Sequence, residues 1–161
     1  FKNATYWSNE DHWHWAKNAN KREKASFLIE NIEPIEQSGH LKYIASAENG
    51  FARNCPLGFD VLFANGHTEK QMIPIIKYKK KTLCFMADLL PTAGHVSLPF
   101  IMGYDTRPLI TLEEKEAFLN LAANENYYLF MEHDACNEII TVKHSEKGVR
   151  LNSTHSFNSI F

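Results

Sequence analysis

The sequence predicts an α/β domain, and three observations support this fold class. Nearly continuous apolar runs, typical of strands covered on both faces, occupy residues 59–64, 82–87 and 127–131. Segments with apolar residues at helical spacing alternate with them, around residues 20–39 and 111–122. The chain has 161 residues, of which 44% are hydrophobic, and a formal net charge of −2, as expected for one compact domain.

The first forty residues predict a strand followed by two helices. Residues 1–7 are strand-like, and Ser8 can cap a helix that runs to about Asn18. Asn20 is then expected to cap a longer helix, which Gly39 ends. Its apolar stripe should face a core and comprises Ala25, Leu28, Ile29, Ile32 and Ile35.

Further strands are predicted from residue 41 onward. They cover residues 41–44, 59–64, 72–78, 82–87 and 127–131, and a closing hairpin joins 138–143 to 149–151. Thr111 and Glu114 form a capping box that predicts the start of a helix. The connection over residues 89–108 is rich in Pro and Gly and is long for a compact domain, which indicates a functional loop.

Composition excludes several classes of protein. The sequence has no run of about 20 apolar residues that could span a membrane, and no secretory signal, so we expect a cytoplasmic protein. Basic residues are not clustered enough to predict binding to nucleic acid. The chain opens on Phe1 without an initiator Met, so we expect the natural polypeptide to extend upstream.

Three of the apolar runs end at potential metal ligands. Residues 59–65 lead into Gly66-His67-Thr68, residues 82–87 end at Asp88, and residues 127–131 end near His133. If these strands run side by side in one direction, the two imidazoles and the carboxylate meet at one edge of the sheet. Such donors suit Zn²⁺ or Fe²⁺. Taken singly, each residue could also be an ordinary turn or capping residue.

These segments resemble a known family. Gly66-His67-Thr68, Asp88 and His133 look like the third, fourth and fifth metal-binding motifs of the metallo-β-lactamase-fold hydrolases, and residues 1–6 resemble the strand after the second motif in lactonase-like members. The resemblance implies that residues 1–161 form a single partial domain. This would be the C-terminal half of an αβ/βα sandwich, with a mixed sheet and covering helices. The family's His-x-His-x-Asp-His motif is absent from this sequence.

The resemblance also implies a reaction. In a complete enzyme His67 would join one metal's His set, Asp88 would bridge two zinc ions, and His133 would bind the second ion. A metal-bound hydroxide would then attack an ester, lactone or amide in a small-molecule substrate. Iron or manganese could replace zinc, because both accept the same ligands.

The long loop supplies two candidate catalytic residues. His95 or Tyr104 could donate a hydrogen bond to the leaving group or to a developing oxyanion. Arg107 could instead anchor this loop by pairing with Asp105.

Three ligands do not complete a two-metal centre, so we expect the chain alone to be inactive. A half sandwich would also leave an apolar sheet face uncovered. We therefore expect self-association, or pairing with the missing N-terminal half.

Two other functions are open at this stage. His67, Asp88 and His133 are two His and one carboxylate, the ligand set of mononuclear non-haem iron enzymes. Alternatively, the chain is a non-catalytic interaction module in which these residues are structural.

Overall fold

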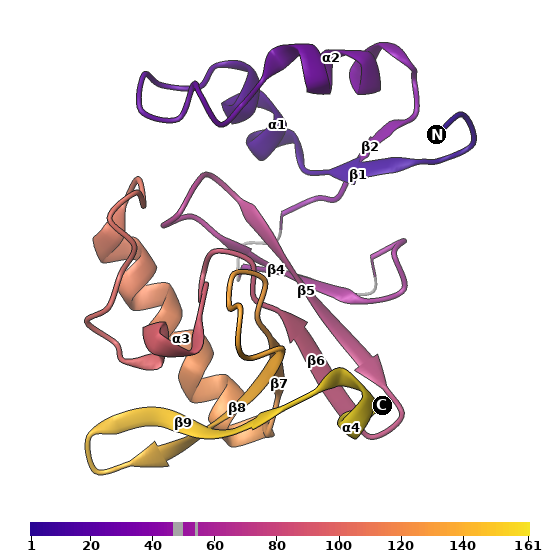
Figure 1. The fold of residues 1–161 in the computed structure, drawn as a ribbon. Coiled ribbons are helices and arrows are strands. Elements are labelled where there is room, and N and C mark those ends of the chain that lie inside the picture. Colours follow the sequence, from indigo (N-terminus) through magenta and orange to yellow (C-terminus); the bar gives the residue numbers. More distant parts are fainter. Residues whose placement is uncertain (47–49, 54) are drawn as a thin grey trace.

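The computed structural model describes residues 1–46, 50–53 and 55–161, and it has two parts (Figure 1). A small N-terminal part, drawn in indigo and purple, lies above a larger sheet with one long helix. Of the helices in the described residues, none has both the length and the apolar character needed to cross a membrane. From the sequence we also expect a loop over residues 48–58, between the predicted strands at 41–44 and 59–64, and part of it falls outside the described residues.

The N-terminal part consists of two strands and two helices. Strand β1 (Tyr6–Ser8) pairs in parallel with β2 (Leu41–Tyr43), and helices α1 (Glu10–Lys17) and α2 (Ile29–Gln37) lie between them in the chain. All residues of α2 are exposed or half-buried, so the prediction that its apolar stripe faces a core is wrong. Within α1 only Ala16 is buried, and Trp7 of β1 packs against a cluster that includes Val61 and Phe63 of the larger sheet.

Helix caps in this part differ from the prediction. Asn9, not Ser8, caps α1, because its Oδ1 accepts a hydrogen bond from the His12 amide at 2.8 Å. Asn20 accepts hydrogen bonds from the amides of Arg22 and Glu23, but these close a local turn and no helix follows directly. A short polar side chain stabilises either arrangement, so composition alone does not separate them.

Seven strands form one mixed sheet within the described residues. Their order across the sheet is β3 (Phe51–Ala52), β4 (Asp60–Ala64), β5 (Gln71–Tyr78), β6 (Lys81–Phe85), β7 (Tyr128–Phe130), β8 (Ile139–Ser145) and β9 (Gly148–His155). Strands β6 and β7 pair in parallel, and the other neighbours pair antiparallel. Because β4 and β6 both run antiparallel to β5, strands β4, β6 and β7 all point in the same direction.

Helix α3 (Pro108–Glu125) covers one face of this sheet. Its buried residues pack with alternate residues of the central strands; the core includes Ile73, Cys84, Leu129, Phe118, Leu119 and Ala122. The helix starts at Pro108, so the predicted capping box at Thr111 is wrong. Proline is favoured in the first turn because its missing N–H has no partner there anyway. A short 3₁₀ helix, η1 (Ala93–Val96), precedes α3, and α4 (Phe157–Ile160) ends the chain.

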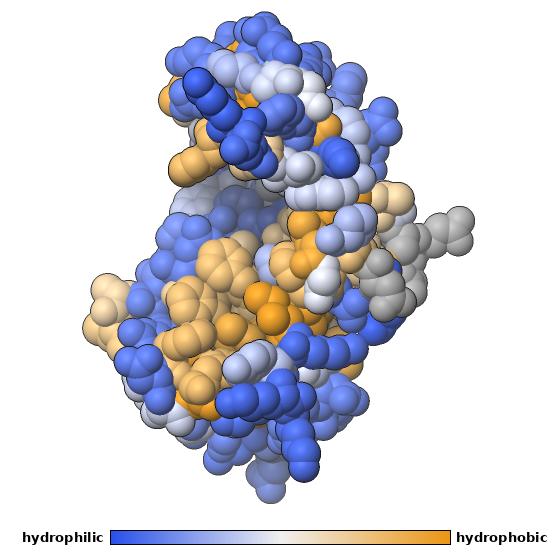
Figure 2. Space-filling view, turned by 90° about the vertical axis from the view of Figure 1, so that its right-hand side faces the viewer, coloured by the Kyte–Doolittle hydropathy of each residue, from blue (hydrophilic) through white to orange (hydrophobic). Residues whose placement is uncertain are grey.

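The opposite face of the sheet remains half-exposed and apolar. Figure 2 shows hydrophobic side chains gathered on this side, below the N-terminal part. By strand alternation, the face carries Pro74, Ile76, Leu83, Phe85, Tyr128 and Phe130. The rings of Phe85 and Phe130 stack with centroids 5.7 Å apart. An apolar patch of this kind is typical of a surface that contacts another chain.

Association through this face is therefore a testable prediction. We expect the chain to elute above its 18.5 kDa monomer mass in size-exclusion chromatography with light scattering. Replacing Phe85 and Phe130 by Ser should shift it towards the monomer, because the apolar contact area falls. A clean wild-type monomer with little binding of a hydrophobic dye would contradict the prediction.

Candidate functional site

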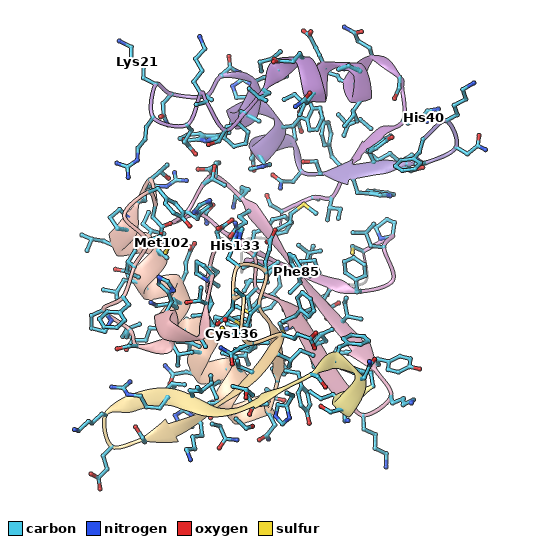
Figure 3. All side chains as sticks on the ribbon, viewed as in Figure 1. Lys21, His40, Phe85, Met102, His133 and Cys136 are labelled. Carbon is cyan, nitrogen blue, oxygen red and sulfur yellow. The ribbon has the colours of Figure 1, made fainter. Side chains whose placement is uncertain are left out.

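The candidate site lies where β4, β6 and β7 end, below the N-terminal part of the molecule. The turn after β4 carries His67, the turn after β6 carries Asp88, and the loop after β7 carries His133. Figure 3 shows His133 between the sheet and the N-terminal part. The strand ends thus hold all three predicted ligands at one edge of the sheet, as expected for a ligand site of an α/β fold.

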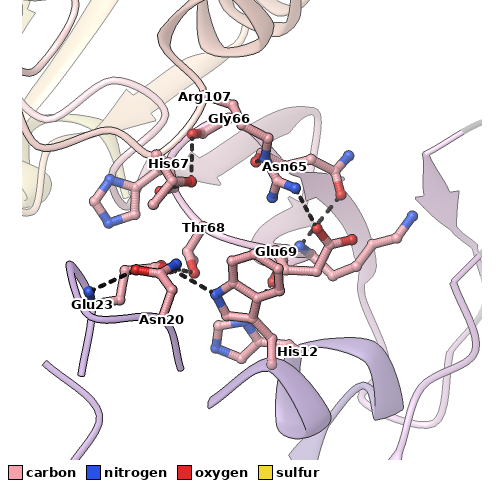
Figure 4. Close-up of polar contacts among 12 residues, drawn as sticks. His12, Asn20, Glu23, Asn65, Gly66, His67, Thr68, Glu69 and Arg107 are labelled. Atoms are coloured by element: carbon pink, nitrogen blue, oxygen red, sulfur yellow. Dashed lines mark hydrogen bonds and ion pairs between the residues drawn. The ribbon is translucent and has the colours of Figure 1, made fainter. Parts of the chain in front are cut away.

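The turn before His67 is held tightly against α3. The Glu114 carboxylate accepts hydrogen bonds from the amides of Asn65 and Gly66, at 2.8 and 3.0 Å. A side chain at Gly66 would collide with the backbone of Thr111, so only glycine allows this contact. Arg107 donates from Nε to the Asn65 carbonyl at 2.8 Å (Figure 4). The position of His67 is therefore fixed by packing of the turn on the helix.

The three predicted ligands come together around Asp88. His67 Nε2 lies 3.5 Å from Asp88 Oδ2, and His133 Nε2 lies 3.2 Å from Asp88 Oδ1. Each imidazole thus faces a different oxygen of the same carboxylate. Gln71, which sequence reasoning did not find, donates to Asp88 Oδ2 at 3.3 Å.

These distances suit shared coordination of metal ions. Two ligand atoms of one tetrahedral zinc ion, each about 2.0–2.1 Å from the metal, lie about 3.3 Å apart. The two His–Asp88 separations of 3.5 and 3.2 Å bracket that value. Within residues 1–46, 50–53 and 55–161, however, no group of three or more His, Cys, Asp or Glu side chains is arranged to hold one ion. The described residues therefore contain two pairs of candidate ligands that share Asp88.

His67 is oriented by a buried carboxylate. Its Nδ1 lies 2.9 Å from Oδ1 of Asp105, whose side chain is only 1% exposed. Burial opposes protonation, but the Asp105 hydrogen bond and the charges of Asp88, Asp105 and Glu23 outweigh it and raise the pKa of His67. The expected pairing of Arg107 with Asp105 is wrong, since Arg107 Nη1 binds Glu69 at 2.7 Å.

Glu23 connects the N-terminal part to the site, a role that the sequence did not indicate. Its buried carboxylate accepts hydrogen bonds from Thr68 Oγ1 at 2.8 Å and from Trp15 Nε1 at 3.0 Å (Figure 4). Thr68 directly follows His67, so this carboxylate ties the N-terminal segment to the ligand turn. Glu23 lies in a polar turn, and nothing in its local sequence distinguishes it from a surface residue.

A cavity of about 820 Å³ opens beside the candidate ligands. His67, Asp88 and Tyr104 line one side, and Trp7, Phe27 and Met72 are apolar residues elsewhere in its wall. Its volume suits a small-molecule ligand. The Tyr104 ring packs edge-on against His67 with centroids 5.6 Å apart. Burial and the charges of Asp88 and Asp105 raise the pKa of Tyr104, so its phenol remains a hydrogen-bond donor at neutral pH.

The other predicted catalytic residue, His95, takes a different position. The described residues that line this cavity do not include His95. Its Nδ1 lies 2.8 Å from Thr92 Oγ1, and its carbonyl accepts a hydrogen bond from Lys115 Nζ at 3.0 Å. Burial and the charge of Lys115 lower the pKa of His95.

Comparison with known proteins identifies the fold. No family model matches the chain, and no curated protein matches it. Among solved structures, a probable metal-dependent hydrolase from Staphylococcus aureus is similar, with 21% identity, a TM-score of 0.78 and coverage of 97% of this chain and 55% of that one. The hydrolase AbOPH of the beta lactamase superfamily aligns with 18% identity and a TM-score of 0.76, covering 96% of this chain and 56% of that one.

The third similar structure is AidC, a dizinc quorum-quenching lactonase in complex with a product. It has 19% identity and a TM-score of 0.74, with 96% of this chain and 56% of AidC covered. The chain has the metallo-β-lactamase fold in part. It spans about half the length of these structures, which fits the C-terminal half predicted from the sequence.

The close contact at Gly66 gives a prediction for this part of the metallo-β-lactamase fold. Gly66→Ala should lower the free energy of unfolding by about 1–3 kcal/mol or more, because the new methyl group meets the Thr111 backbone. Gly103→Ala is the matched control, since a Cβ there meets nothing within 4 Å, and it should change stability by less than about 0.5 kcal/mol. Chemical denaturation measures both. Equal losses of stability in the two variants would contradict the close contact between Gly66 and Thr111.

Lys115 gives a prediction about pH. It is 1% exposed, and its Nζ donates to the carbonyls of His95, Ser97 and Phe100, which holds the loop after Asp88 to α3. Burial lowers the pKa of Lys115 to about 8, against the attraction of Asp105. Because the folded-state pKa lies below the unfolded value of 10.5, the folded state loses its proton first as pH rises.

Wild-type stability should therefore rise relative to Lys115→Met between about pH 8 and pH 10.5, by up to about 3 kcal/mol. Below pH 8 Lys115 is protonated in both the folded and the unfolded state, so it should add no pH dependence to the stability difference between the two proteins. Denaturant unfolding at several pH values measures the slope. A difference that stays flat or falls across this window would contradict the lowered pKa.

Proposed function

We propose that this chain is part of a metal-dependent hydrolase in which His67, Asp88 and His133 hold divalent metal ions, zinc in the first place. The observation that carries the proposal is the position of Asp88, whose two oxygens each face a different imidazole, at 3.5 and 3.2 Å. A carboxylate placed in this way suits a bridge between two ions, with one His on each. Bound ions would supply Lewis acidity, which acidifies water and polarises a carbonyl or phosphoryl group.

The surrounding residues have separate tasks in this proposal. The Tyr104 phenol borders the cavity next to His67 and can donate a hydrogen bond to an oxygen that gains negative charge during the reaction. The catalytic role of His95 stays a prediction. Trp7, Phe27 and Met72 offer an apolar wall to the non-reacting part of a small ester, lactone or amide.

The described donors fit an incomplete centre. Each proposed ion receives one His and a shared Asp88 from this chain, fewer than the four ligands of a closed zinc site. The remaining ligands would come from polypeptide corresponding to the rest of the similar structures, of which this chain spans about half. The geometry at Asp88 disfavours a mononuclear iron centre, because the two imidazoles face different oxygens of this carboxylate.

Zinc titration by calorimetry tests the proposal. The chain should bind zinc more weakly than a complete four-ligand site, for which binding contributes about 10–16 kcal/mol. Asp88→Asn should reduce the affinity at least tenfold, since one bridging carboxylate serves both His residues. Asp60→Asn removes a carboxylate at the opposite end of β4 and should leave zinc affinity unchanged.

Two outcomes would contradict this assignment. Equal zinc affinity in wild type and Asp88→Asn would exclude Asp88 as a ligand and favour the interaction module. Appreciable ester or lactone turnover by the zinc-loaded chain would contradict the expectation that this part is inactive alone.

A further inference from the structure

Asp105 is a buried carboxylate in the loop between η1 and α3, and it faces the ring of His67 from the side opposite Asp88. Its Oδ1 lies 2.9 Å from His67 Nδ1, while His67 Nε2 lies 3.5 Å from Asp88 Oδ2. The two nitrogens of one imidazole thus face two different carboxylates. Asp88 is half-buried beside the cavity, whereas the Asp105 side chain is only 1% exposed and is absent from the cavity wall.

We infer that Asp105 is a positioning residue that fixes His67 in the tautomer with hydrogen on Nδ1, which leaves the Nε2 lone pair directed towards Asp88. An ionised carboxylate only accepts hydrogen bonds, and of the two contacts only the one to Asp105, at 2.9 Å, is a hydrogen bond, whereas Asp88 lies 3.5 Å away, so Nδ1 carries the hydrogen. In a neutral imidazole the other nitrogen then has a free lone pair, the form that binds metals. The consequence for metal binding rests on the proposed function, whereas the tautomer itself does not.

The backbone around Asp105 holds this arrangement in place. The amide of Thr106 donates to the His67 carbonyl at 3.2 Å, and the amide of Arg107 donates to the Gly66 carbonyl at 2.9 Å. Thr106 Oγ1 donates to the His67 carbonyl as well, at 3.0 Å. These hydrogen bonds, together with the one from Arg107 Nε to the Asn65 carbonyl, join the residues after Asp105 to the turn that carries His67 and so hold the two side chains opposite each other.

A buried lysine also interacts electrostatically with Asp105. Lys115, 1% exposed, is bound by three carbonyls of the loop before Asp105 and attracts the Asp105 carboxylate. Within the described part of the chain nothing donates to Asp105 Oδ2, so this carboxylate is buried without full hydrogen bonding. Such a group is costly for stability alone. Its position is better explained by its action on His67.

Nitrogen NMR of the metal-free chain tests the tautomer directly. Because the pKa of His67 is raised, long-range ¹H–¹⁵N spectra are recorded in steps of rising pH until its signals stop shifting, and they then show which nitrogen of the neutral ring carries the hydrogen. Comparison with a His67→Gln variant assigns the signals. We expect the Nδ1–H form to dominate in wild type. A dominant Nε2–H form, or an even mixture, would overturn the inference without any need for a variant of Asp105.

Asp105→Asn tests the consequence. The amide can either accept or donate, so it no longer enforces one tautomer. The Nδ1–H population should fall, and zinc affinity should drop about 10- to 100-fold, as for other outer-shell partners of metal-binding His residues. Asp60→Asn is the matched control and should change neither readout.

A purely structural role predicts a different pattern. Asp105→Asn would then lower the melting temperature while the His67 tautomer and zinc affinity stay as in wild type, and this result would overturn the inference. Failure of wild type to bind zinc would contradict the proposed function instead. In that case the tautomer measurement still decides the role of Asp105.

Discussion

The common direction of β4, β6 and β7 is the constraint on which the candidate site depends. Strand β5 runs antiparallel to both β4 and β6, and β7 joins β6 in parallel, so three strands end at the same edge. Residues separated by 21 and 45 positions along the chain are thereby brought to hydrogen-bonding or near-contact distances, as the His67–Asp88 and His133–Asp88 separations show. The paired strands hold these ends in fixed positions, so the turn after each strand has to present only one side chain.

The strands and their polar ends could be predicted because both faces of these strands carry apolar residues, one face packed on α3 and the other half-exposed, which leaves nearly continuous apolar runs in the sequence, as at β4 and β6. The side chains that support the site from other elements could not be predicted. Glu114 looks like half of a capping box, but it binds the turn at Asn65, and Glu23 looks like a surface residue, but it holds Thr68. In both cases a long-range contact uses a side chain whose local sequence fits another role.

Charged groups gather around His67. Asp88 and Asp105 face its two nitrogens, and the buried Lys115 interacts electrostatically with Asp105. Buried ionic groups stabilise a fold weakly, because removal from water offsets most of their attraction. Stability alone therefore explains this grouping of charges poorly. A requirement that the imidazole present one nitrogen in a fixed direction explains it well.

The incomplete set of proposed ligands and the half-exposed apolar face would both be satisfied by additional polypeptide. Phe85 and Phe130 lie on that face, and their strands lead directly to Asp88 and His133. The half-exposed surface thus extends to the edge where the Nε2 atom of each imidazole faces one oxygen of Asp88. A single added layer of polypeptide on this face would bury the aromatic pair and also reach the ligand edge. Packing of that layer on the sheet and completion of the proposed metal centre would then be coupled, because a metal that binds only the folded form stabilises that form.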